Sequence, residues 1–238
     1  MAGALLACLL LGGSAEAQWE LTGFLGASIT PPSDVHVRLA GRDTSLRFSE
    51  VDWRTESFES PLYYGVRVGY WLRSRPWLGL GAELIHAKVR ANPGQEVAVS
   101  GSLQGAALHR IERLGEIVQN LSISHGMNYL FATVALRRRF RSTPQAPEGR
   151  WDLVLRGGFG PTLPHAETTI LNRTRGEYQY GGLAAQVGAG VVWWARPHFG
   201  WSGEYKLSYS PVDFDTAEGA ARTTLVSHHF ITGLGWRW

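Results

Sequence analysis

The chain has 238 residues, of which 44% are hydrophobic and 18% charged, which excludes a disordered chain and suits a single barrel-sized domain. Its 23 basic and 20 acidic residues leave a net charge of +3, and the arginines are scattered, so we expect no nucleic-acid partner. The single cysteine, Cys8, lies in the N-terminal leader; disulfides, thiol catalysis and cysteine-ligated metals are therefore excluded for the rest of the chain.

Residues 1–17 are predicted to be a cleaved signal peptide. An apolar run over 5–11 is followed by small residues and a cleavage-like tripeptide at 15–17, although no lysine or arginine precedes the run. The neighbourhood of Cys8 loosely resembles a lipoprotein cleavage box, but too few residues precede it for that kind of signal. We expect a secreted precursor whose mature domain covers residues 18–238.

Alternation of apolar and polar residues predicts eight strands in the mature domain. Along residues 62–73, Tyr64, Val66 and Val68 share one face with other apolar side chains, and the opposite face carries glycine and Arg67. This stretch is longer than a typical soluble strand and fits a tilted membrane strand. The predicted strands are residues 19–29, 62–73, 77–89, 127–137, 151–163, 181–194, 199–209 and 224–238.

The connections between the predicted strands alternate in length. Residues 74–76, 141–150 and 196–198 form turns that are short or polar and proline-marked, whereas the long connections cover residues 30–61, 90–119, 164–178 and 210–222. Outer-membrane barrels have short periplasmic turns and long external loops, with both chain ends on the periplasmic side. We therefore predict an all-β, eight-stranded antiparallel transmembrane β-barrel with up-and-down topology. The alternative is a secreted lipocalin-like barrel, whose apolar face points inward.

Aromatic residues favour the membrane-spanning alternative. Nine of the ten tryptophans, all but Trp53, lie near strand ends that this topology places on the periplasmic side, and several tyrosines lie near the opposite ends. Such rings prefer the two membrane–water interfaces. A soluble core gives no reason for this sorting.

The face opposite the apolar one predicts a polar interior. Eight strands enclose a space that side chains just fill, so we expect a packed network rather than an open pore. Its predicted members are Arg67, Glu83, Arg156, Gln186, Glu204 and Lys206.

The last strand carries apolar residues at alternate positions, Leu234, Trp236 and Trp238. This pattern resembles the insertion signal that the barrel assembly machinery reads, although phenylalanine is its usual last residue. We expect a monomer in the outer membrane of a Gram-negative bacterium. Its expected partners are that machinery, outer-membrane lipids and lipopolysaccharide.

No motif for catalysis stands out, but histidines gather in the predicted outer half of the barrel. Residues 122–128 break the alternation where a strand enters the membrane, and Ser124, His125 and Asn128 of this segment are the candidate catalytic residues. A divalent metal ion is the candidate cofactor of the protein. Its candidate ligands are His165, His228 and His229. The alternative for each histidine is a plain interfacial hydrogen bond.

Segments 58–67, 112–116, 124–126, 164–167, 203–209 and 228–235 resemble lipid A oxidases, a group within the OmpA/OmpW-like superfamily of outer-membrane barrels. The resemblance implies oxygen-dependent oxidation of the proximal glucosamine of lipid A to 2-aminogluconate, and it carries over no catalytic residues. Residues 124–128 do not match the His-x-Ser-Asn motif of the 3-O-deacylases. The sequence leaves open whether the chain is an enzyme. The alternative is a non-catalytic barrel for envelope integrity, adhesion or minor solute passage.

Overall fold

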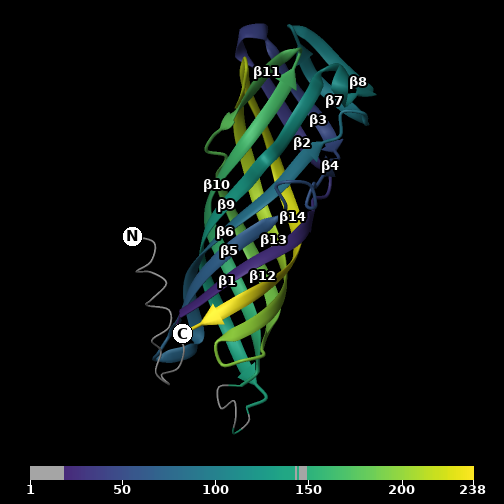
Figure 1. Ribbon diagram of the computed structural model, residues 1–238. Coiled ribbons are helices and arrows are strands. Elements are labelled where there is room, and N and C mark those ends of the chain that lie inside the picture. Colours follow the sequence, from purple (N-terminus) through teal and green to yellow (C-terminus); the bar gives the residue numbers. More distant parts are fainter. Residues whose placement is uncertain (1–18, 143, 145–148) are drawn as a thin grey trace.

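The computed structural model describes residues 19–142, 144 and 149–238, without the side chains of Ser124 and His125. The predicted signal peptide lies outside these residues. All the strands join one sheet (Figure 1). They are β1 (Trp19–Ile29), β2 (Ser33–Leu39), β3 (Thr44–Val51), β4 (Trp53–Arg54), β5 (Tyr64–Leu72), β6 (Arg75–Ala91), β7 (Glu96–Leu103), β8 (Ala106–Arg113), β9 (Val118–Phe140), β10 (Trp151–Ile170), β11 (Arg173–Tyr178), β12 (Gly182–Trp194), β13 (Phe199–Thr216) and β14 (Gly219–Arg237).

Eight of these strands form a closed ring. Antiparallel pairing runs in the order β1, β5, β6, β9, β10, β12, β13 and β14, and β14 pairs with β1 to close it. Backbone hydrogen bonds of 3.2 and 3.1 Å between Trp19 and Trp238 extend the closure. Each barrel strand neighbours the next barrel strand along the chain, so the predicted eight-stranded up-and-down barrel is confirmed.

The prediction of long loops is wrong in large part. The expected connections 30–61, 90–119 and 164–178 contain β2, β3, β7, β8 and β11, and the barrel strands run on into them, so that β9 has 23 residues. We call this continuation the extension; Figure 1 shows it at the end of the barrel away from the C-terminus. Its strands form because the alternation continues: Val35, Val37 and Leu39 are all buried.

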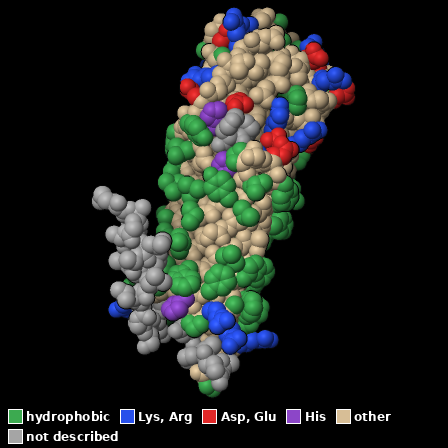
Figure 2. Space-filling model, in the orientation of Figure 1, with side chains coloured by type: hydrophobic (Ala, Val, Ile, Leu, Met, Phe, Trp, Pro, Cys, Tyr) green, Lys and Arg blue, Asp and Glu red, His purple; other side chains and the backbone are tan. Residues whose placement is uncertain are grey.

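The inward and outward faces exchange character between barrel and extension. On β13 the outward side chains pass from Tyr205 and Tyr209 to Asp213, whereas the inward ones pass from Lys206 to Phe214. Figure 2 shows hydrophobic side chains over the barrel wall and charged ones above them. We call the exposed apolar wall the belt. It includes Leu21, Leu25, Val66, Val68, Leu80, Leu130, Val134, Leu155, Phe159, Leu183, Val187, Tyr209, Val226, Phe230 and Leu234.

The tryptophans divide between the two faces of the barrel wall. Trp19, Trp77 and Trp201 are exposed on the outside, as expected for an interface. Trp71 and Trp194 also lie at strand ends but are buried inside the barrel, so they do not belong to an outward girdle of aromatic rings. Successive residues of a strand point to opposite faces, and these two have the inward parity.

Helices contribute little to this fold. The described residues contain two short 3-10 helices, Ala40–Arg42 and Leu114–Glu116. Within residues 19–142, 144 and 149–238, no helix is long and apolar enough to cross a membrane.

Candidate functional site

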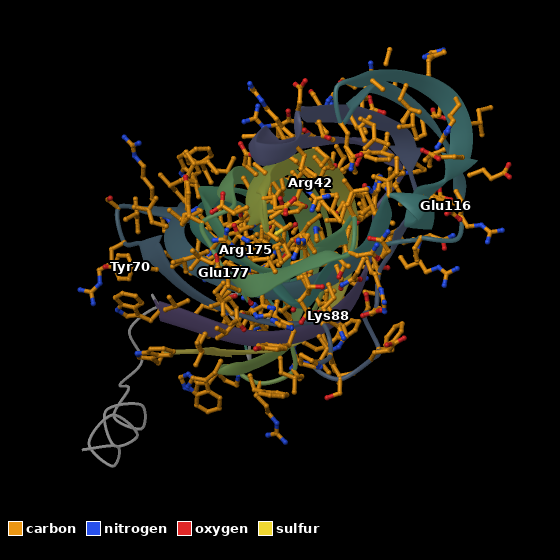
Figure 3. All side chains as sticks on the ribbon, turned by 90° about the horizontal axis from the view of Figure 1, so that it is seen from above. Arg42, Tyr70, Lys88, Glu116, Arg175 and Glu177 are labelled. Carbon is orange, nitrogen blue, oxygen red and sulfur yellow. The ribbon has the colours of Figure 1, made fainter. Side chains whose placement is uncertain are left out.

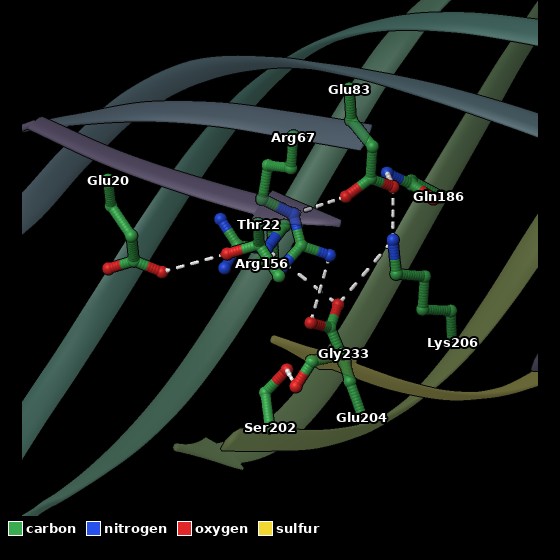
Figure 4. Close-up of polar contacts among 10 residues, drawn as sticks. All are labelled: Glu20, Thr22, Arg67, Glu83, Arg156, Gln186, Ser202, Glu204, Lys206 and Gly233. Atoms are coloured by element: carbon green, nitrogen blue, oxygen red, sulfur yellow. Dashed lines mark hydrogen bonds and ion pairs between the residues drawn. The ribbon is translucent and has the colours of Figure 1, made fainter. Parts of the chain in front are cut away.

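The centre of the barrel is organised around the Glu83 carboxylate, which projects inward from β6 (Figure 4). Arg67 on β5 donates to one of its oxygens through Nε, and Lys206 on β13 donates to the other through Nζ. Gln186 Nε2 on β12 donates to the same oxygen as Lys206, at 2.9 Å. These side chains come from four strands, so the network ties the ring together across its interior.

A second carboxylate, Glu204, shares the same cations. Its Oε2 lies 3.0 Å from Arg67 Nη2, and its Oε1 lies 3.7 Å from Arg156 Nε and 3.6 Å from Lys206 Nζ. The side chains of these four residues are at most 6% exposed. All six residues assigned to the interior from the sequence therefore lie in one network. Buried cations need such partners, since removing one partner leaves a charge unpaired away from water.

Polar layers on either side of this network also fill the barrel. Towards the chain ends, Trp71 Nε1 donates to Glu20 Oε2 at 3.0 Å and Trp194 Nε1 to Asp152 Oδ2 at 2.9 Å. The Arg137 guanidinium lies over the Trp71 ring, 3.9 Å from its centroid. The alternation in the sequence puts Trp71 and Asp152 on the same face as the central network, opposite the apolar face.

A third layer lies towards the extension, around His229. Its Nδ1 is 3.1 Å from the Tyr63 hydroxyl and its Nε2 is 2.8 Å from the Ser208 hydroxyl, so both ring nitrogens are engaged. Its neighbour His228 points outward, where Nδ1 lies 2.7 Å from the Tyr205 hydroxyl. The structure thus places two of the candidate metal ligands on opposite faces of one strand.

The third candidate, His165, projects from β10 on the far side of the ring from β14. Its Nδ1 lies 3.8 Å from Glu167 Oε1, and its ring packs edge-on against Tyr178, with centroids 4.7 Å apart. The described side chains include no group of three or more histidine, cysteine, aspartate or glutamate residues that could hold a metal ion. The three candidate ligands are therefore not brought together.

The segment with the candidate catalytic residues is a bulge of β9. Pairing with β6 is regular up to Ala87↔Met127 and resumes at Val89↔Ile123, so β9 has extra residues between these pairs. One of them, Gly126, has a φ of 119°, and a Cβ there would lie 2.4 Å from His86 Cε1. On the other side, pairing with β10 is interrupted between Pro164 and Glu167. The backbone of Ser124 and His125 belongs to this bulge, while their side chains lie outside the description.

Described side chains beside the bulge form what we call the rim patch: Tyr64, His86, Asn128, His165, Glu167 and Tyr178. His86 Nδ1 lies 2.9 Å from Asn128 Oδ1, and the imidazole stacks on the Tyr64 ring with centroids 4.8 Å apart. His86 Nε2 is buried and has no hydrogen-bond partner among the described residues. The patch adjoins belt residues such as Leu130, so it lies where the apolar wall ends.

The residues of the predicted insertion signal lie along the end of the barrel that holds both termini of the ring. Leu234 and Trp236 are exposed on the outer wall, and the Trp238 backbone pairs with Trp19. Their recognition by an assembly machinery stays a prediction.

Comparisons with known proteins find similar solved structures but no related sequence. No family model matches the chain, and no curated protein is similar to it in sequence. Among solved structures it is similar to Neisserial surface protein A, with 9% identity over 95% of this chain and 100% of that chain and a TM-score of 0.48. For outer membrane protease OmpT from Escherichia coli the identity is 10%, the coverages 97% and 100%, and the TM-score 0.45. For the outer membrane protein OprG from Pseudomonas aeruginosa the identity is 10%, over 94% of this chain and 97% of that chain, and the TM-score is 0.43.

At these identities and TM-scores the likeness assigns neither a family nor an activity, and the fold rests on the strand pairing itself. The resemblance to lipid A oxidases is not shown by the comparisons.

Proposed function

We propose that this protein is an outer-membrane β-barrel of the OmpA/OmpW-like kind in a Gram-negative bacterium. The observation that carries the proposal is the exchange of faces between barrel and extension. Leu25, Phe159, Val187 and Phe230 are each more than half exposed on the barrel wall. A continuous apolar wall of this extent is unfavourable in water and is stabilised by hydrocarbon. The charged outer wall of the extension suits the aqueous side of that membrane.

The filled interior supports a function at the outer surface rather than solute passage. Three polar layers occupy the barrel, and the extension above them has an apolar core that includes Val35, Phe48 and Phe214. An eight-stranded barrel leaves no room for a channel beside such side chains. Minor solute passage is therefore the least supported of the alternatives.

At the rim, the proposal is that the protein binds lipid A and modifies it. The rim patch sits where the belt ends, which is the depth of the lipid A sugars when acyl chains cover the belt. Its imidazoles, amide, carboxylate and phenols can hydrogen-bond to sugar hydroxyls and phosphates. The reaction proposed from the resemblance is oxidation of the proximal glucosamine to 2-aminogluconate with oxygen as the oxidant. No step is assigned to a metal ion. A non-catalytic barrel with the same lipid contacts is the alternative.

Mass spectrometry of lipid A tests the modification. We expect the parent strain and a complemented deletion strain to carry lipid A heavier by one oxygen atom than that of the deletion strain. Identical lipid A in all three strains contradicts a modifying role and leaves the non-catalytic barrel.

His125 is the residue proposed to take a proton from the sugar. His125→Ala is expected to abolish the modification while leaving barrel assembly intact, because the residue belongs to the bulge beyond the belt. The matched control is His228→Ala, an outward histidine on β14, which lies opposite β9 in the ring. Normal lipid A modification by well-assembled His125→Ala protein removes this residue from the site.

A further inference from the structure

The outer wall of the extension is hollowed at a place apart from the rim patch. A cavity of about 650 Å³ opens between β14, β2, β3 and β7. Small residues line it, including Ser45, Ser100, Gly101 and Ala220, together with the basic residues His36, Arg38, Arg47 and Arg222. We call this cavity the trough. None of the residues that line the trough belongs to the rim patch, so the two features are separate.

The strand register explains why basic side chains gather there. Arg222 of β14 pairs with His36 of β2, His36 with Arg47 of β3, and Arg47 with Ser100 of β7. Residues paired across strands share a face, so these side chains form one row along the trough. Arg38 lies two residues from His36 on the same face of β2 and is exposed.

Two of the arginines are held in place by carboxylates. Arg47 donates hydrogen bonds through Nε and Nη2 to Asp34 Oδ2, at 3.1 and 2.6 Å. Arg222 donates through the same two atoms to Asp213 Oδ2. The hydrogen bond from Arg47 lowers the pKa of Asp34 below its ordinary value, so this pair keeps its charges at neutral pH. Arg38 has no ion pair among the described residues.

Stability of the fold does not account for this arrangement. Basic side chains on neighbouring strands repel one another, and exposed ion pairs add little to the stability of the fold. The basic side chains nevertheless gather where small residues leave a hollow beneath them, which suggests a role in binding. A guanidinium fork matches the oxygens of a phosphate or sulfate ester, and serine hydroxyls in the lining can bond to sugar hydroxyls.

The height of the trough points to one source of such esters. Along β13 and β14, Asp213 and Arg222 lie four residues beyond the exposed belt pair Tyr209 and Val226. Four residues of strand span about 13 Å, which is about 10 Å along the membrane normal for a strand tilted by about 40°. That distance places the trough among head-group sugars when acyl chains cover the belt.

We propose that the trough binds phosphate-bearing core sugars of the lipopolysaccharide around the barrel, an inference that rests on the outer-membrane location proposed above. Arg38 supplies the unpaired cation. The guanidinium groups of Arg47 and Arg222 lie in the same trough and are positioned by Asp34 and Asp213. The bound sugar chain then fixes lipopolysaccharide molecules to the outer wall of the extension.

Calorimetric titration of the full-length barrel, in phospholipid nanodiscs free of lipopolysaccharide, tests the proposal. The probe is the phosphorylated core oligosaccharide released from lipopolysaccharide by mild acid. We expect binding that weakens as salt is raised. Arg38→Gln should weaken it about fivefold, the upper range for one exposed charge contact. Asp213→Asn should strengthen it, because it removes a negative charge from the trough.

The matched control is Arg110→Gln on β8, an exposed arginine paired with Glu112 and outside the trough lining. Equal affinities for the Arg38→Gln and Arg110→Gln variants overturn the proposal, as does equal binding of the dephosphorylated oligosaccharide. Tighter binding of a sulfated glycosaminoglycan fragment overturns the assignment to lipopolysaccharide. Because the assay uses purified protein in nanodiscs, its failure leaves the proposed location untouched, and membrane fractionation tests that location separately.

Discussion

At the scale of single residues, position along a strand decides whether a charge stabilises the protein. Glu83 is 1% exposed and accepts from Arg67, Lys206 and Gln186, so its charge is fully used. Glu177 makes the same kind of contact with Arg175, yet both side chains are more than a third exposed. Water solvates Glu177 and Arg175 in both the unfolded and the folded chain, so their contact adds little stability. The Glu83 carboxylate is shielded from water in the folded chain and depends on its three hydrogen-bond donors.

Glu83→Gln is expected to lower the free energy of unfolding by about 3–5 kcal/mol, because Arg67, Arg156 and Lys206 then share the single carboxylate of Glu204. The measurement is urea unfolding in lipid vesicles. Glu177→Gln is the control and should cost about 0–1 kcal/mol. Adding Lys206→Met to Glu83→Gln should recover part of the loss. Equal stabilities of the two single variants contradict the role given to the network.

Val68 and Gly69 are neighbours on β5 that face opposite sides of the wall. Val68→Arg puts a charge on the belt and should cost about 2–4 kcal/mol. Gly69→Ser should cost much less, because a Cβ there would meet nothing within 4 Å. Unfolding titrations of the two variants give the comparison, and equal tolerance shows that the facing is misassigned.

At the scale of elements, the extension owes its order to pairing with strands that continue from the barrel. β2 pairs with β14, β3 with β2, and β7 with β3, each burying apolar residues such as Val37, Phe48 and Val99. β8 ends this series: it pairs with β7 alone, and Ile111 is 72% exposed. Arg110 and Arg113 on this edge oppose pairing with another chain.

We expect amide hydrogen exchange to be fastest in β8 among the strands of the extension. Its residues bury little apolar surface, so local opening costs little free energy. The continuation of β9 beyond the barrel, which pairs with β10 and includes the buried Val118 and Leu121, should be protected. Exchange followed by mass spectrometry measures this order. Stronger protection in β8 than in β9 means that another surface covers it.

At the scale of the whole molecule, one ring of strands meets two environments. Where the outer wall is apolar (Figure 2) the interior holds the polar layers, and where the outer wall is charged the interior is apolar. Seen from above (Figure 3), the strands of the extension curve away from the ring on one side, with β7 and β8 outermost. The apolar core of the extension is continuous with buried barrel residues such as Phe24 and Phe131, which adjoin the central network.

The whole-molecule prediction concerns membrane and gel behaviour. We expect the protein to fractionate with outer membranes and to change its mobility on a denaturing gel when it is boiled, because a closed strand ring with a buried ion network resists detergent until heated. A soluble periplasmic product with one mobility contradicts the proposed topology.

The sequence by itself determined the wall of the barrel. Strict alternation located all the barrel strands and put Arg67, Glu83, Arg156, Gln186, Glu204 and Lys206 on the inner face, because side-chain parity is a local property of an extended chain. The alternation also continues into a segment expected to be a loop, where Val35, Val37 and Leu39 alternate with polar residues. In the extension these apolar side chains are buried, whereas in the barrel the apolar side chains face outward. The alternation alone does not show where along a strand this exchange of faces occurs.

Only the tertiary structure decided which residues meet across strands. His228 and His229 are adjacent in sequence and face opposite environments, while Arg222, His36 and Arg47 are distant in sequence and form one row. Register sets these neighbours, and it depends on the closure of the ring and on how far each strand continues past the belt. No local pattern encodes either, so the trough could be found only in the folded chain.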